Sequence, residues 1–298
     1  MGMSTFIRKM ISFPLISEFL SRGITCYVWA KHKQARRRIS LSGLMKYCFA
    51  KPSFLEARKY FLYTRSDDVF DFYQIKGFKE LFNYPKSLST LDLAYLIYEH
   101  FYERGWHYYE IPQTNIEQGD IIIDCGAAEG LFAFKNQRRA GHVYLFEPLS
   151  VFVESLRFLF KNSGNVSIFE EAVSDKEEMV YLKPNSVGSI CQRECCGKDC
   201  LQVKASTIDA HFYEKGIKID YLKVDVEGFE ENVISGALKT IRRDKPKMAL
   251  ATYHQGQDHR RILEIILAQV PEYHFLEKGI GGKNGSPVIL HMWVDKKS

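Results

Sequence analysis

Two carboxylates, Asp225 and Glu227, stand two residues apart at the end of a short hydrophobic run, and Lys223 lies within that run. His254 stands just past a later hydrophobic run. A carboxylate or an imidazole can remove the proton of a hydroxyl group, and a lysine can pair with a carboxylate or orient a polar substrate. These four residues are therefore candidate catalytic residues for a proton transfer, provided that the fold brings the ends of the two runs together.

A glycine turn follows another hydrophobic run. Residues 121–123 are three isoleucines with no polar alternation, which is typical of a central parallel strand buried on both faces. Asp124 ends the run, and Gly126 and Gly130 permit positive φ angles and a close backbone approach to a ligand. Because the next segment can be helical, its first amides would point at that ligand. The segment therefore predicts a pocket for a nucleotide cofactor.

The spacing of this turn indicates which cofactor is bound. The dinucleotide fingerprint needs G-x-G-x-x-G after the strand, and this turn lacks it. Residues 124–130 instead read D-x-G-x-A-x-G, the acidic-x-G-x-G-x-G pattern of S-adenosylmethionine (SAM) sites with alanine at the middle glycine. Glu147 and Pro148 follow the hydrophobic run 143–146, and a carboxylate there can accept hydrogen bonds from both ribose hydroxyls. That carboxylate would serve SAM or NAD alike, so the turn spacing carries the preference for SAM.

Alternating strands and helices must position these groups. Strands are expected at 121–124, 143–146, 166–169, 221–224 and 248–253, helices from 131 and over 151–161, 233–241 and 258–269, and a closing strand pair at 273–277 and 288–294. This order predicts an α/β fold of βαβ units with a final antiparallel strand. With a boundary near Gly105, residues 106–298 form the catalytic domain, and residues 1–105 form a basic extension that is expected to stay helical through 66–105.

Six short segments follow one another between residues 109 and 230. They are Tyr109-Glu-Ile-Pro112, Asp124-Cys-Gly-Ala-Ala-Glu-Gly130, Glu147-Pro148, Glu171-Ala-Val-Ser-Asp175, Thr207-Ile-Asp209 and Lys223-Val-Asp-Val-Glu-Gly-Phe-Glu230. In these segments and their order the chain resembles the FkbM family of SAM-dependent methyltransferases. The resemblance implies a Rossmann-like, seven-stranded class I methyltransferase sheet. It also implies O-methylation of a hydroxyl on a sugar, a glycan or a secondary metabolite.

The resemblance also implies the residues that contact SAM. They are Asp124, Gly126, Ala127, Ala128, Glu129, Gly130, Glu147, Pro148, Glu171, Ala172 and Asp225. Two positions depart from the family pattern, because Ala128-Glu129 stands where Ala-Asn is more usual and Glu171 where asparagine is more usual. Hydrogen bonds around the methionine and adenine ends are therefore expected to differ in detail.

Methyl transfer to a hydroxyl needs the nucleophile and the methyl group held in line and a base for the hydroxyl proton. We expect Asp225 near the methionine amine or the acceptor hydroxyl, with His254 or Glu227 as the base. An ordinary loop histidine at position 254 remains the alternative interpretation.

Positive charge is concentrated at the front of the chain. Residues 1–65 hold 13 Lys and Arg against two acids, a local +11, and the remaining 28 basic and 34 acidic residues give −6, which sums to the net +5. This segment has no run of 18 uncharged apolar residues, and Pro14, Glu18 and Arg22 interrupt its apolar stretches, which excludes a spanning helix and argues against a signal peptide. We expect a cytoplasmic protein, with residues 1–65 either in weak peripheral contact with an anionic membrane or packed on the core as helices with a solvated basic face.

Four of the seven cysteines fall within ten residues, Cys191, Cys195, Cys196 and Cys200. Four thiolates can form a tetrahedral zinc site, although the order C-x3-C-C-x3-C lacks the C-x2-C knuckles of common zinc sites. Reduced thiols in a loop or an occasional disulfide are the alternatives to a structural zinc.

Other functional classes remain open. A non-catalytic nucleotide-binding protein or an NAD-linked enzyme could use the same sheet, although the density of polar residues at the strand ends opposes the first and the turn spacing opposes the second. A nucleic-acid substrate is disfavoured because the catalytic part is net acidic and no N/D-P-P-Y/F motif follows the fourth strand. The sequence identifies neither the methyl acceptor nor the oligomeric state.

Overall fold

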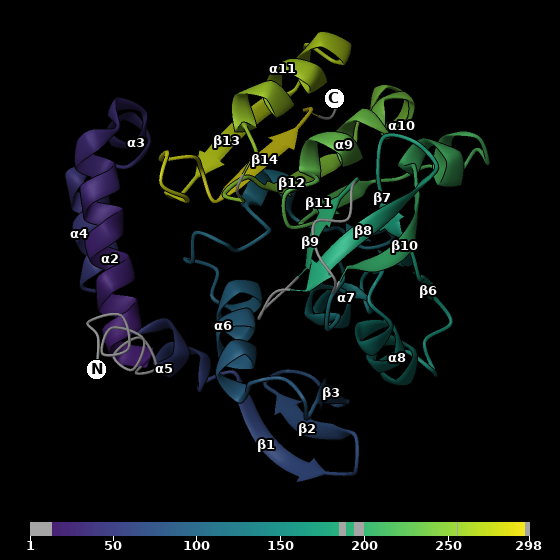
Figure 1. Ribbon diagram of the computed structural model, residues 1–298, viewed down its shortest axis with the longest axis horizontal. Coiled ribbons are helices and arrows are strands. Elements are labelled where there is room, and N and C mark those ends of the chain that lie inside the picture. The colour runs from purple at the N-terminus through teal and green to yellow at the C-terminus, as the bar shows by residue number, and fades with distance from the viewer. Residues whose placement is uncertain (1–13, 185–188, 194–199, 255, 296–298) are drawn as a thin grey trace.

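The computed structural model describes residues 14–184, 189–193, 200–254 and 256–295. Its centre is a seven-stranded sheet in the order β13-β14-β12-β11-β4-β5-β6 (Figure 1). The strands are β4 (Ile121–Cys125), β5 (His142–Phe146), β6 (Val166–Phe169), β11 (Tyr221–Val224), β12 (Lys247–Ala251), β13 (His274–Lys278) and β14 (Ile289–Trp293). Counted in chain order within this sheet, they run 6-7-5-4-1-2-3. All neighbours pair in parallel except β14, which is antiparallel to both β12 and β13. The predicted α/β sheet with a closing antiparallel strand is confirmed.

Helices cover both faces of this sheet. They are α6 (Thr90–Phe101), α7 (Leu131–Asn136), α8 (Ser150–Leu159), α9 (Glu230–Ser235), α10 (Leu238–Asp244) and α11 (His259–Gln269). Ile122 packs in one hydrophobic cluster and the adjacent Ile123 in another, and neither is exposed to solvent. Burial on both faces is the reason that the strand reads as an unbroken apolar run. The helix expected over 233–241 is split into α9 and α10 at Gly236, where a Cβ would come within 2.1 Å of the Ser174 carbonyl oxygen.

Strand register gathers the ends of three central strands at one edge. Cys125, the last residue of β4, pairs with Phe146 of β5 and with Val224 of β11. The residues that follow these three are the glycine turn, Glu147 and Asp225. Because all three strands are parallel, their carboxyl ends meet at the crevice where α/β proteins bind ligands.

A second, four-stranded sheet fills the part of the chain between β6 and β11. It comprises β7 (Ala172–Val173), β8 (Glu178–Pro184), β9 (Ser189–Gln192) and β10 (Leu201–Ser206), in the order β7-β10-β8-β9. It is followed by the short helical turn η2 (Asp209–Tyr213). No strand was predicted between residues 169 and 221.

The expected helical character of residues 66–105 holds for α6 and is wrong for the residues before it. The chain forms β1 (Phe61–Ser66), β2 (Phe70–Ile75) and β3 (Leu81–Pro85), a three-stranded antiparallel sheet. The Asp67 carboxylate accepts hydrogen bonds from the amides of Val69 and Phe70, at 2.9 and 2.7 Å, and so closes the first hairpin. Aromatic-rich segments favour strands, and Phe72 and Tyr73 of β2 are buried.

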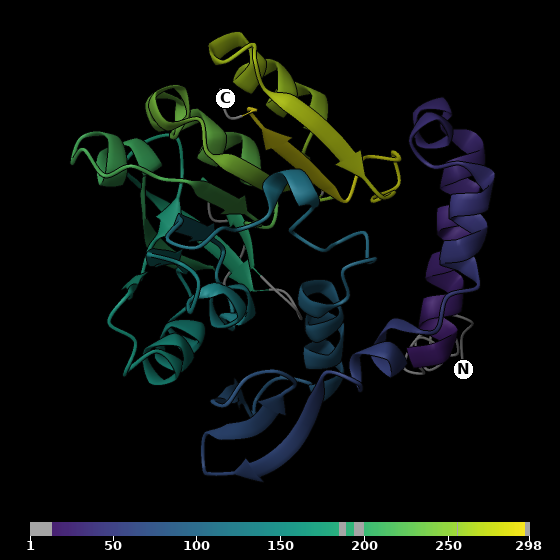
Figure 2. The same ribbon diagram turned by 180° about the vertical axis from the view of Figure 1, so that it is seen from behind.

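Three helices, α2 (Pro14–Lys31), α3 (Lys33–Arg38) and α4 (Leu41–Cys48), form an arm beside this body. The next helix, α5 (Ser53–Ala57), packs against α6 and buries Ala57 in the main core. Helices α2 and α4 lie side by side in both views, away from the seven-stranded sheet (Figures 1 and 2). Arg38 joins the arm to β13 through an ion pair with Glu277 at 2.8 Å, and Tyr47 stacks on Trp106 at 4.0 Å between ring centroids. Among the described helices, none is both long and apolar enough to cross a membrane.

Candidate functional site

The glycine turn after β4 is held against the neighbouring strand end. Gly126 has a φ of 78°, and a Cβ there would lie 1.9 Å from the carbonyl oxygen of Asp225. Gly130, the N-cap of α7, has a φ of 86°, and a Cβ there would lie 2.5 Å from a methyl group of Leu156. Ala128 takes a φ of 45°, so the turn keeps at its centre a backbone conformation that favours glycine. Both glycines are therefore required by geometry.

Glu147 connects this turn to the end of β5. Its Oε2 accepts a hydrogen bond from the amide of Ala128, and its Oε1 accepts one from the amide of Leu149, both at 2.9 Å. The residue is 5% exposed and lines the cavity described below. Burial raises the pKa of Glu147 to about 7, although the two amides act in the opposite direction. Glu147 thus presents a fixed, buried hydrogen-bond acceptor to the cavity.

Lys223 and Asp124 form a buried ion pair beneath the turn. The Nζ of Lys223 lies 2.7 Å from Oδ1 of Asp124 and donates a second hydrogen bond to the carbonyl of Gly126 at 2.9 Å. Their side chains are 4% and 0% exposed. Lys223 reaches the cavity wall, whereas Asp124 is not among the lining residues. Asp124 therefore acts on the cavity through Lys223, which ties β11 to the turn.

Asp225 lies at the centre of a polar cluster just above this pair. The hydroxyl of Tyr109 donates a hydrogen bond to its Oδ2, and its Oδ1 lies 3.5 Å from Nε2 of His254. Burial opposes ionisation of Asp225, but His254, His107, Lys223 and the Tyr109 hydroxyl together lower its pKa. Asp225 is therefore a carboxylate at neutral pH.

His254 is held from behind by Glu230, the first residue of α9. Its Nδ1 lies 2.7 Å from Oε1 of Glu230, and its Nε2 lies 3.4 Å from Oε2 of Glu227. Burial disfavours the charged imidazole, but the hydrogen bond to Glu230 and the negative charges of Asp225 and Glu227 raise the pKa of His254 to about 9. The fold thus brings together Asp225, Glu227 and His254, as the positions at the strand ends predicted.

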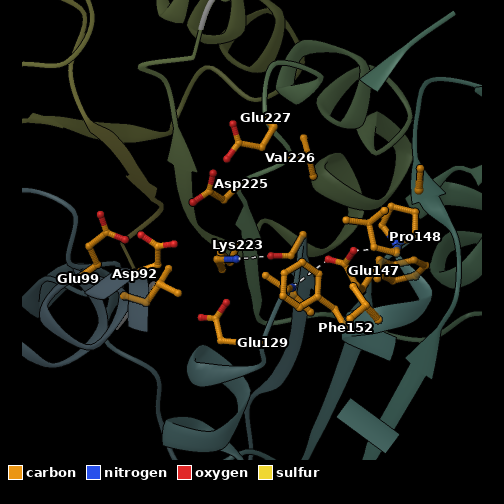
Figure 3. A pocket seen from close by; sticks show the side chains of 18 of the residues that line it. Asp92, Glu99, Glu129, Glu147, Pro148, Phe152, Lys223, Asp225, Val226 and Glu227 are labelled. Carbon is orange, nitrogen blue, oxygen red and sulfur yellow. Dashed lines mark hydrogen bonds between the residues drawn. The ribbon is translucent and has the colours of Figure 1, made fainter. Parts of the chain in front are cut away.

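These groups surround a cavity of about 620 Å³, within the range of small-molecule pockets. Glu147, Pro148 and Phe152 lie on one side of Lys223 in Figure 3, and Asp92 and Glu99 lie on the other. We call the first side the turn side and the second the α6 side. The carboxylates that line the cavity are Asp92, Glu99, Glu129, Glu147, Asp225 and Glu227. Burial raises the pKa of Glu129, like that of Glu147, to about 7.

Most of the predicted site residues line this cavity. They are Gly126, Ala127, Ala128, Glu129, Glu147, Pro148, Ala172, Lys223, Asp225 and Glu227. Gly130 and His254 lie just outside the lining. Glu171 also lies outside it, because its carboxylate pairs with Nε2 of His211 at 2.6 Å. Contact between Glu171 and the cofactor stays a prediction.

The predicted cysteine site falls largely outside the described residues. Cys195 and Cys196 are not described, Cys191 is described only as part of β9, and Cys200 is partly buried. A zinc site at these four cysteines stays a prediction.

Sequence reasoning missed the contribution of α6. Asp92 and Glu99 are seven residues apart and lie on one face of this helix with Tyr95 and Leu96, all lining the cavity. Two acids at this spacing on an amphipathic helix are a signal that was available, since i and i+7 share a helix face. Tyr109 opens one of the six segments but was not predicted to line the cavity, and Tyr253 carried no signal.

The strand order and the site define a class I methyltransferase fold. A family model described as the methyltransferase FkbM domain matches residues 124–276, more than half of the chain. The chain belongs to this family. No curated protein matches it.

Solved structures with similar folds include a methyltransferase FkbM from Methylobacillus flagellatus, 16% identical, with a TM-score of 0.47 over 69% of this chain and 56% of that one. Another is an rRNA methylase from Streptococcus thermophilus, 10% identical, with a TM-score of 0.38 over 61% of this chain and 90% of that one. A third is SAM-bound fibrillarin from Aeropyrum pernix, 14% identical, with a TM-score of 0.37 over 62% of this chain and 69% of that one. The chain thus spans little more than half of the Methylobacillus protein.

Proposed function

We propose that this protein is a SAM-dependent methyltransferase that methylates a hydroxyl oxygen of a small-molecule or glycan acceptor. The observation that carries the proposal is Glu147, a buried carboxylate fixed by two backbone amides beside a turn that tolerates no side chain at Gly126. Such a carboxylate can accept hydrogen bonds from both hydroxyls of a ribose. Family membership supports the same cofactor.

The residues present fit SAM on the turn side of the cavity. Glu147 would hold the ribose, and the apolar side chains of Pro148, Val151 and Phe152 would face the adenine. Asp225 and Glu129 would lie toward the methionine end. When bound, SAM supplies an electrophilic methyl group on a sulfonium, which a hydroxyl oxygen can attack in line.

The α6 side suits a hydroxylated acceptor. Asp92 and Glu99 offer carboxylate oxygens to hydroxyl groups, and the rings of Tyr95, Tyr109 and Tyr253 offer flat apolar surfaces. Sugars present both hydroxyls and apolar faces, so this lining supports a sugar or glycan. Of the two candidate bases at this end, Glu227 would take the proton of the reacting hydroxyl, because the raised pKa of His254, about 9, keeps that imidazole protonated at neutral pH.

Calorimetric titration tests the cofactor assignment. S-adenosylhomocysteine should bind, NAD and ATP should not, and Glu147→Ala should abolish the binding. A preference for NAD would overturn the proposal. After binding is shown, hydroxylated sugars and glycan extracts should accept labelled methyl groups, and Asp92→Asn and Glu99→Gln should raise KM for the acceptor more than they change the affinity for S-adenosylhomocysteine.

The helical arm supports a second proposal, peripheral contact with an anionic membrane. Large apolar side chains are exposed along α2 and at the end of α4, with Phe19 67% exposed and Phe49, the C-cap of α4, 80% exposed. Basic residues of α3, among them Arg36 and Arg37, lie on the same arm. Apolar and basic side chains together are typical of helices that bind at an anionic interface.

Flotation with vesicles tests this contact. The full chain should float with vesicles rich in phosphatidylserine and not with phosphatidylcholine vesicles, and Phe19→Ser with Ile24→Ser should reduce flotation. Equal and poor flotation with both lipids would refute membrane contact. A concentration-dependent dimer that the same double variant dissolves would instead assign the apolar face to a second copy of the chain.

A further inference from the structure

Three potential metal ligands converge at the ends of β11 and β12. A carboxylate oxygen of Asp225, a carboxylate oxygen of Glu227 and a ring nitrogen of His254 all lie within 4.8 Å of one another. The imidazole Nε2 lies 3.5 Å from Oδ1 of Asp225 and 3.4 Å from Oε2 of Glu227. Figure 3 shows the carboxylates of Asp225 and Glu227 side by side at the upper end of the cavity. Three ligands from two strand ends therefore surround one small volume.

The imidazole nitrogen that faces this volume is buried and makes no hydrogen bond to the two nearby carboxylates. The side chain of His254 is 6% exposed, and its Nε2 has no hydrogen-bond partner among the described residues. Its other nitrogen, Nδ1, donates to the fully buried carboxylate of Glu230 at 2.7 Å. With Nδ1 donating to Glu230, the position of the proton or lone pair on Nε2 lies toward the two carboxylates. A bound metal ion would therefore take the place of a proton on Nε2.

Glu230 fixes this orientation. Its Oε1 also accepts hydrogen bonds from the amides of Val226 and Gly228, at 3.2 and 3.3 Å. The same carboxylate thus holds both the imidazole and the loop that carries Glu227. Metal-binding histidines typically donate their second N–H to such a carboxylate, which sets the tautomer and orients the ring.

The neighbouring cation cannot neutralise the cluster. The Nζ of Lys223 is bound to Asp124 and to the carbonyl of Gly126. Tyr109 engages Oδ2 of Asp225, so that Oδ1 remains for another partner. Six carboxylates line the cavity together with this one lysine. A divalent ion in place of the proton on Nε2 of His254 would add one positive charge beside Asp225 and Glu227.

We propose that Asp225, Glu227 and His254 bind a divalent metal ion, with Glu230 as the residue that positions His254. One imidazole nitrogen and two carboxylate oxygens suit first-row ions such as Mn²⁺ and Zn²⁺. Asp225 and Glu227 line the cavity, so the remaining coordination positions face the acceptor. Resting on the proposed function, the role of the ion is to coordinate the acceptor hydroxyl and lower the pKa of that hydroxyl.

Manganese binding tests the site without any need for the acceptor. The full chain, stripped with a chelator, is titrated with Mn²⁺, and free Mn²⁺ is followed by electron paramagnetic resonance. We expect about one Mn²⁺ per chain and, in spin-echo spectra of the bound ion, modulation from a directly coordinated nitrogen. Zn²⁺ should displace the bound Mn²⁺ if the two ions share the site.

Variants separate ligands from the general acidity of the cavity. His254→Ala should remove the nitrogen modulation. Glu227→Gln changes a side chain that is 45% exposed, so the fold should be retained, and it should weaken Mn²⁺ binding. Glu230→Gln should weaken it by about 10- to 100-fold. The matched controls are Glu231→Gln, next to Glu230 but outside the cluster, and Glu99→Gln, in the cavity but outside the cluster, and both should bind Mn²⁺ as the unmodified chain does.

Two results would overturn the metal site. One is the absence of binding at millimolar Mn²⁺ and Zn²⁺, and the other is binding that Glu99→Gln weakens as much as Glu227→Gln does, with no nitrogen modulation. S-adenosylhomocysteine binding is measured on the same samples. If the chain binds S-adenosylhomocysteine but no metal ion, the metal site is rejected and the proposed methyltransferase stands. If it binds the metal ion but not S-adenosylhomocysteine, the proposed methyltransferase is rejected and the metal site stands.

Discussion

The turn side and the α6 side of the cavity are built in different ways. On the turn side, backbone groups within a single stretch set the geometry, and Glu147 receives its hydrogen bonds from main-chain amides. On the α6 side, side chains from α6, from the segment around Tyr109, and from the ends of β11 and β12 face one another. A backbone-defined site can serve one invariant ligand, whereas a site made of distant side chains can be altered one residue at a time. We therefore infer that the turn side holds the cofactor and that the α6 side sets the specificity for the acceptor.

The largest expected effect is on the turn side. Gly126→Ala would place a Cβ 1.9 Å from the carbonyl oxygen of Asp225, and we expect a loss of about 3 to 5 kcal/mol in the free energy of unfolding. Denaturant unfolding measures it. Gly77→Ala is the matched control, because Gly77 also has a positive φ, 89°, but open space around it. That change should cost about 1 kcal/mol, and equal losses in both variants would show that the backbone angle alone matters.

A smaller effect is expected on the α6 side. Tyr109→Phe removes the hydroxyl that donates to Oδ2 of Asp225 and should lower the free energy of unfolding by about 1.5 to 3 kcal/mol, since the acceptor is charged and buried. The affinity for S-adenosylhomocysteine should change little. The control is Tyr221→Phe, whose hydroxyl donates to the neutral carbonyl of Tyr109 at 2.5 Å and should cost about 1 kcal/mol. A large loss of cofactor affinity in Tyr109→Phe would remove the division between the two sides.

The pH dependence of cofactor binding sharpens the comparison further. Because burial raises the pKa of Glu147 to about 7, the carboxylate that we propose accepts hydrogen bonds from the ribose is ionised above that pH and becomes protonated as the pH falls through it. Calorimetry should show the affinity for S-adenosylhomocysteine falling about tenfold between pH values of about 8 and 6.

Two variants assign this dependence to one residue. Glu147→Gln should bind weakly with little change across this pH range. Glu129→Gln should keep the pH dependence, although the pKa of Glu129 is also raised to about 7. A pH-independent affinity in the unmodified chain would show that the charge of Glu147 has no part in binding.

The smallest effect concerns the centre of the turn. Ala128→Gly relieves the strain of a φ of 45° but increases the conformational freedom of the unfolded chain, and we expect a net change within about 0.5 kcal/mol. Ala127→Gly is the control, because Ala127 is 5% exposed with no positive φ, and it should destabilise by about 1 to 2 kcal/mol. Thermal unfolding distinguishes the two, and similar losses would mean that Ala128 is not strained.

Much of the fold could be predicted from local patterns. The strand at residues 121–123 was evident because β-branched residues buried on both faces leave a continuous apolar run. The N-terminal sheet was missed because the aromatic residues of β2 and the turn at Asp67 were read as part of a helical region. The four-stranded sheet around β8 was missed because nothing in its sequence marks the long-range pairing of β7 with β10.

The residues of the candidate site were likewise only partly predictable from the sequence. Gly126, Glu147 and Asp225 were predicted because each follows a recognisable strand, and parallel pairing places all three at one edge. Asp92 and Glu99 were not predicted, because their arrival at the cavity depends on where α6 packs. The cofactor contact predicted for Asp124 stays a prediction, and in the structure its carboxylate pairs with Lys223 beneath the turn.

The sequence by itself determined the α/β class, the glycine turn and the carboxylate that follows the second strand of the sheet. These features depend on contiguous residues, on the backbone freedom of glycine and on the burial periodicity of strands. Only the tertiary structure decided that α6 closes the cavity, that Glu230 orients His254, and that the imidazole faces Asp225 and Glu227. Those contacts join residues distant in sequence, and their geometry follows from how helices pack on the sheet.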